Sequence, residues 1–124
     1  MEELIRTIED LTSILSALTP ESMTPERIAE TESTLLGLDM AGSIERFSAS
    51  LPMRPEDEAA AEAYDERMRK KVDAINRSVS AARRELERIR EWRATLDLEA
   101  LDELISLARG HVRSLYDFTS SLQE

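Results

Sequence analysis

Residues 68–89 read MRKKVDAINRSVSAARRELERI, and their pattern indicates a long helix packed against other helices. Its apolar residues are spaced alternately by four and three positions, which is the heptad spacing of a helix that packs against other helices. These residues and one aromatic residue beyond them form the predicted interaction seam: Met68, Val72, Ile75, Val79, Ala82, Leu86, Ile89 and Trp92. Because neither Gly nor Pro follows Pro55 before residue 97, we expect one helix over about 55–96. A helix of about 40 residues is about 60 Å long, so the molecule should be elongated.

The remainder of the C-terminal half predicts a second helix over about 97–122, with Asp97 as its N-cap. Its apolar stripe is wider than a two-stranded seam requires, so this helix should touch two or more neighbours. The stripe consists of Leu98, Leu101, Ile105, Ala108, Val112, Leu115 and Leu122, flanked by Leu104, His111 and Phe118. A tight helical hairpin at 95–97 is favoured over a continuous, bent helix, although the connection contains neither Gly nor Pro.

The N-terminal part, residues 1–51, predicts short helices that pack on the rest, over about 3–18, 25–38 and 40–51. Pro residues punctuate this part, and Pro at a first helical position favours a helix start. The segment 51–55 contains two of the four Pro residues and should be a hinge or a tight turn. Residues 1–51 and 55–124 together should form one all-α domain. We expect this domain to be either an elongated helical bundle or an antiparallel coiled-coil hairpin with one long central helix.

Charge is unevenly distributed along this acidic chain of 124 residues, whose net charge is −10. Residues 56–66 contain six acids and no base, whereas residues 67–93 contain ten bases and four acids. This polarity suits the dipole of a single helix. It also suits an antiparallel pairing of two copies, or a contact between the basic stretch and the acidic N-terminal helices of the same chain.

The residues that most catalytic and metal sites need are scarce. There is no cysteine, and the one histidine, His111, has no carboxylate or second histidine at helical ligand spacing, which favours a half-buried packing role. The acid pairs Glu58–Glu62 and Glu62–Glu66 favour a solvated helix face. No Gly-rich phosphate loop occurs. We therefore expect no enzyme activity, no catalytic residue, no metal site and no cofactor.

These patterns predict a non-enzymatic helical protein that binds other proteins, as an adaptor, an assembly subunit or a chaperone-like binder of a partner helix. We expect a homodimer through the long helix, because that helix is longer than the remaining chain can cover. Trp92 suits either the core or an interface. Further candidate partner contacts are Arg83, Arg84, Arg88, Arg90, Tyr116 and Phe118.

The alternative function is a nucleic-acid-associated regulator that uses residues 67–93, although the net charge of −10 makes nucleic acid an unfavourable partner. No apolar run is long enough to cross a membrane, and the acidic N-terminus lacks the basic residues of a secretory signal. We therefore expect a soluble, cytoplasmic protein without a membrane partner. Fourteen Arg against two Lys favours a bacterial or phage source.

Overall fold

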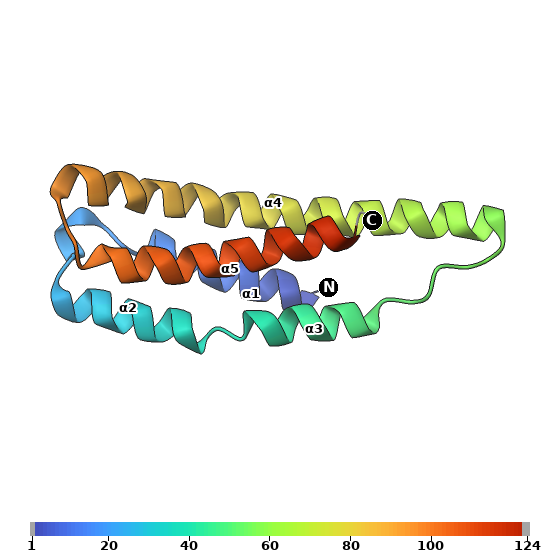
Figure 1. Ribbon diagram of the computed structural model, residues 1–124, viewed down its shortest axis with the longest axis horizontal. Coiled ribbons are helices and arrows are strands. Elements are labelled where there is room, and N and C mark those ends of the chain that lie inside the picture. Colours follow the sequence, from blue (N-terminus) through green and yellow to red (C-terminus); the bar gives the residue numbers. More distant parts are fainter. Residues whose placement is uncertain (1, 123–124) are drawn as a thin grey trace.

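The computed structural model describes residues 2–122, and it contains helices and no strand over that range. The elements are α1 (Glu2–Ser16), the 3-10 turn η1 (Pro20–Ser22), α2 (Pro25–Gly37), α3 (Met40–Ser50), α4 (Glu58–Leu96) and α5 (Leu101–Leu122). Figure 1 shows them as long, nearly parallel rods. The prediction of an all-α, elongated bundle is confirmed.

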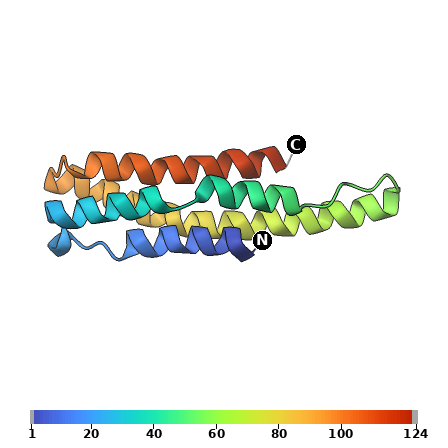
Figure 2. The same cartoon turned by 90° about the horizontal axis from the view of Figure 1, so that it is seen from below.

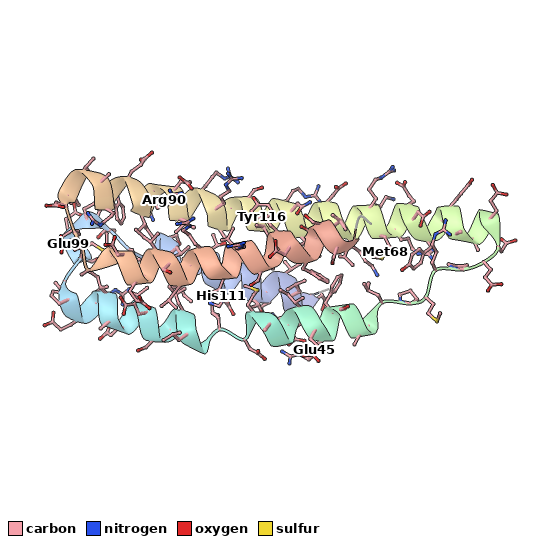
Figure 3. The ribbon with its side chains drawn as sticks, viewed as in Figure 1. Glu45, Met68, Arg90, Glu99, His111 and Tyr116 are labelled. Atoms are coloured by element: carbon pink, nitrogen blue, oxygen red, sulfur yellow. The ribbon has the colours of Figure 1, made fainter. Side chains whose placement is uncertain are left out.

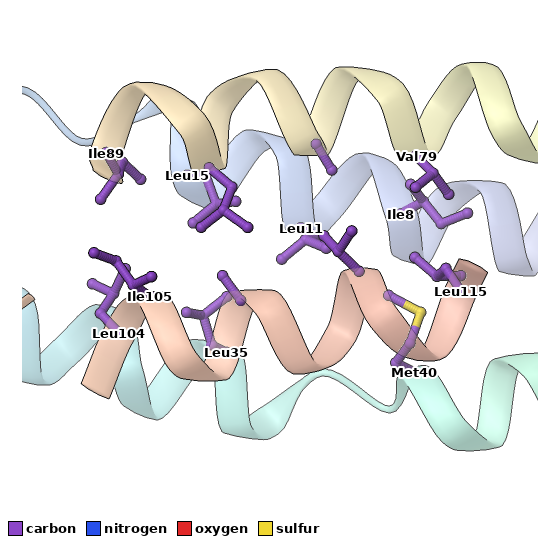
Figure 4. Packing of buried hydrophobic residues seen from close by; sticks show 14 of the residues in the cluster. Ile8, Leu11, Leu15, Leu35, Met40, Val79, Ile89, Leu104, Ile105 and Leu115 are labelled. Atoms are coloured by element: carbon purple, nitrogen blue, oxygen red, sulfur yellow. The ribbon is translucent and has the colours of Figure 1, made fainter. Parts of the chain in front are cut away.

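The helices form four rods around one core. Both α1 and α5 pack along α4, while α2 and α3 follow each other end to end and form the fourth rod, against α1 and α5 (Figures 1 and 2). One cluster of buried apolar side chains joins all five helices, and Figure 4 shows part of it. The seven-residue spacing of α4 therefore serves a bundle in which a helix faces two neighbours.

The break between α2 and α3 follows from the local sequence. Thr24 caps α2, since its side-chain oxygen accepts a hydrogen bond from the backbone N–H of Arg27 at 3.1 Å. After Gly37 the chain leaves the helix for two residues, and the Asp39 carboxylate then accepts the Gly42 N–H at 3.0 Å and caps α3. The two glycines thus mark the junction at which one rod is built from two short helices.

The long helix α4 begins at Glu58, three residues after Pro55, where the sequence predicted its start. Asp57 caps it, with its carboxylate accepting the Ala60 N–H at 3.0 Å, so the first helical residue is Glu58 and Pro55 belongs to the preceding loop. The N-terminal end of α4 extends past the ends of α1 and α5, and the loop after α3 runs out to reach it (Figures 1 and 2). This projecting end is the least covered part of the bundle.

The assignment of Asp97 as an N-cap is wrong. Asp97 follows the last residue of α4 in the left-handed conformation, with φ 51° and ψ 45°, and α5 begins only at Leu101. Aspartate enters this region more readily than most residues other than glycine, which allows a sharp helix end without Gly or Pro. The connection is therefore a tight turn, and the alternative of one continuous, bent helix is ruled out.

Candidate interaction groove

The predicted interaction seam lies inside the bundle over most of its length. The six residues from Val72 to Ile89 are at most 3% exposed, under α1 and α5 of the same chain. Met68 and Trp92, at the two ends, are half-buried. The expectation that the remaining chain cannot cover α4 therefore applies only to its projecting end. The seam needs no second chain to cover it.

Trp92 and Arg88 together tie the end of α1 to α4. The Arg88 guanidinium stacks 4.6 Å from the centre of the Trp92 ring and donates a hydrogen bond to the carbonyl of Leu15 at 3.2 Å. The Arg88 Nη2 atom also lies 2.7 Å from the Glu85 carboxylate and forms an ion pair with it. Among the described residues, the buried atoms Arg88 Nε and Glu85 Oε2 have no hydrogen-bond partner. Because the last turn of α1 contains no basic residue, Arg88 supplies the positive charge that a helix C-terminus favours.

His111 ties the end of α2 to α5 through a hydrogen bond. Its half-buried ring points from α5 towards α2 (Figure 3), and Nε2–H donates to the carbonyl of Leu35 at 2.8 Å. Leu35 lies in the last turn of α2, and its carbonyl also accepts the backbone N–H of Leu38 at 3.2 Å, so the His111 ring is its second donor. Phe118, another candidate contact, packs edge-on against Phe47 of α3 at 5.7 Å between ring centres. These two residues hold the α2–α3 rod against α5 within the chain.

The other candidate contacts lie at the surface, at or near the boundary between α4 and α5. Arg83 donates to the Tyr116 hydroxyl at 3.4 Å, which raises the pKa of Arg83, and its guanidinium lies 5.9 Å from the ring centre. Arg90 pairs with Glu87 at 2.9 Å. Arg84 is exposed on α4 and donates to the carbonyl of Ser80 at 3.4 Å.

A groove of about 830 Å³ runs along this boundary, and we call it the α4/α5 groove. Leu86 and Val112 form its buried, apolar floor. Figure 3 shows Arg90 and Tyr116 where α4 and α5 meet. The residues that line the groove are Arg83, Leu86, Glu87, Arg90, Ser106, Arg109, Gly110, Val112, Arg113 and Tyr116.

Four arginines and one glutamate line the groove, in a chain whose net charge is −10. Arg109 and Arg113 are exposed, stand four positions apart on α5, and have no ion-pair partner among residues 2–122. Like charges at this spacing destabilise a helix by about 0.2–0.5 kcal/mol. The groove thus brings together two arginines that have no ion-pair partner within the described part of the chain and two further arginines of α4.

Arg109 and Arg113, which line the groove together with Arg83 and Arg90, were not predicted from the sequence as contact residues. A signal was present, since these two are the only basic residues after residue 96 and both lie on one face of the predicted C-terminal helix. Placing them beside the basic part of α4 also requires the hairpin and its register. That register is a property of the tertiary structure.

Within the described residues, no three acidic or histidine side chains gather in a way that could hold a metal ion. Over the same range, none of the helices combines the length and apolarity needed to span a membrane. Comparison of the chain with protein-family models, with curated proteins and with solved structures finds no match.

Proposed function

We propose that this chain is a non-enzymatic helical protein that binds other proteins, itself included, through the α4/α5 groove. The observation that carries the proposal is the chemistry of that groove: four guanidinium groups, of which those of Arg109 and Arg113 have no ion-pair partner among residues 2–122, and a tyrosine ring lie above an apolar floor. Arginine and tyrosine are enriched where protein interfaces concentrate their binding energy. An adaptor, an assembly subunit or a chaperone-like binder would each use such a surface.

The form of the groove favours a helical partner. Two antiparallel helices leave a long, shallow channel between them, and a third helix can lie along it with its apolar face on the floor. The stretch from Arg83 to Arg90 is two helical turns, about 10 Å long. Arginines on both walls favour a partner helix that carries carboxylates beside its apolar stripe.

Affinity capture from the native cell tests the proposal when it is run with matched variants. Arg109→Glu/Arg113→Glu reverses two charges in the groove. The control, Arg77→Glu/Arg84→Glu, makes the same charge change at exposed positions of α4 outside it. We expect partners of the wild type to be retained by the control and lost with the groove variant. Identical captures by all three proteins would refute the proposal.

Nucleic-acid binding by residues 67–93 is the second candidate, and one observation favours it. Arg83 and Arg90 of this stretch share a groove with Arg109 and Arg113, so four guanidinium groups could contact phosphates. The net charge of −10 opposes such binding at long range. A salt titration with duplex DNA decides: affinity of about micromolar or tighter with a steep salt dependence supports this candidate, and its absence at physiological salt excludes it.

A further inference from the structure

We infer that the occupant of the α4/α5 groove is the projecting, acidic end of α4 from a second copy of this chain, so that two copies pair antiparallel and exchange these ends. The inference rests on the proposed function, because it takes the groove to be a protein-binding surface. It goes further by naming the partner and the residues that meet.

The projecting end of α4 carries the charge that the groove lacks. Asp65 pairs with Arg54 at 3.0 Å and Glu66 pairs with Arg69. By contrast, Glu58 and Glu62 are exposed, and neither takes part in an ion pair within the described part of the chain. They stand four positions apart, as the two unpaired arginines of α5 do. Each chain therefore displays two like-charge pairs of opposite sign.

The acidic end and the groove lie on the same side of α4. Glu87 lines the groove at about the level of Arg109, because the contact between Arg93 and Asp102 lies about two turns away along both helices. Glu58 and Glu87 are 29 residues apart. Because a helix turns once every 3.6 residues, this separation is close to eight full turns. A twofold axis placed midway between them, perpendicular to the helix, therefore brings the acidic end of each copy over the groove of the other.

The directions of the helices also match. An α4 that enters antiparallel to the resident α4 runs parallel to α5, since α4 and α5 form a hairpin (Figure 1). The pair Glu58–Glu62 then runs in the same direction and with the same spacing as Arg109–Arg113. One alignment thus places Glu58 beside Arg109 and Glu62 beside Arg113, twice in each dimer.

The lengths of the helices leave room for this exchange. α5 ends at Leu122, which lines a hollow with Met68 and Val72, so α5 does not accompany α4 towards residue 58 (Figure 3). The part of α4 that lacks α5 beside it in its own chain would receive the partner's α5 instead. The two α5 helices would then approach end to end near the axis and would not compete for one position.

Light scattering at increasing concentration tests the pairing. We expect the wild type to reach twice the chain mass of 14.1 kDa. Glu58→Arg/Glu62→Arg and Arg109→Glu/Arg113→Glu should each weaken the dimer at least about a hundredfold, because each places like charges opposite one another. Both sets of positions are exposed, so circular dichroism should show unchanged helicity. Arg77→Glu/Arg84→Glu should remain dimeric.

Mixing the two monomeric variants is the decisive step. In a mixed pair the new arginines of one copy meet the new glutamates of the other, and the unchanged charges meet in the second groove, so the dimer should return. A mixture that stays monomeric overturns the inference, as does a wild type that stays monomeric at about 100 μM. Groove-dependent capture of a different protein by such a monomer would preserve the proposed function and remove only this inference.

Discussion

Replacing Val79 by aspartate is the sharpest test of the bundle itself. Val79 is fully buried, within the cluster that joins α4 to α1 and α5 (Figure 4). To remain there at pH 7 the new carboxyl must be neutral, which costs about 4 kcal/mol for a group whose ordinary pKa is about 3.9. Lost burial of the valine side chain adds about 2 kcal/mol, and an unpaired buried polar group about 1 kcal/mol or more.

The expected loss of about 7 kcal/mol is comparable to the whole stability of a domain this size, about 5–15 kcal/mol. We therefore expect Val79→Asp to be largely unfolded, or to unfold at a much lower urea concentration, as followed by circular dichroism. Ser80→Asp places the same charge on the next, exposed residue and should change the stability by less than about 0.5 kcal/mol. A Val79→Asp protein with wild-type helicity and a wild-type urea midpoint would show that this position is not in the core.

Three further predictions concern helix ends and ion pairs. Arg88→Met should cost about 1–3 kcal/mol in urea titrations, through the lost contacts with the Leu15 carbonyl and the Trp92 ring, whereas Arg84→Met should cost almost nothing. Gly37→Ala should raise the thermal midpoint, with a gain of about 0.4–1 kcal/mol, because Gly37 has a negative φ and an added Cβ meets no atom within 4 Å. Gly42→Ala should lower it, since the Cβ would displace the Asp39 carboxylate that caps α3, and equal midpoints for the two would contradict this account. Hydrogen bonds from Arg46 and Arg93 lower the pKa values of Glu3 and Asp102 below their ordinary 4.5 and 3.8, so the unfolded chain binds protons first as the pH falls. Stability should therefore be fully present above about pH 4.5 and decline below it, and Arg46→Gln/Arg93→Gln should reduce this decline in urea titrations at stepped pH values.

Helix positions and buried faces could be predicted from local rules. The alternation of four and three along 68–89 identifies the buried side of α4, because side chains at that spacing share one face of a helix whatever covers them. Thr24 with Pro25 marks the start of α2 for an equally local reason, the cap and the preset backbone angle of proline. The expected packing role of His111 needed only the absence of ligands at helical spacing.

Other features were decided by the tertiary structure, since the apolar stripe of a helix does not determine which other helices pack on it. The same heptads would suit a second chain, and only the assembled bundle shows α1 and α5 over Val72 to Ile89. Asp97 had the residue type of an N-cap, and the hairpin required a left-handed helix end there instead. The α4/α5 groove depends on register: Arg109 and Arg113 meet Arg83 and Arg90 only after the hairpin closes, because side chains distant in sequence become neighbours through packing and not through periodicity.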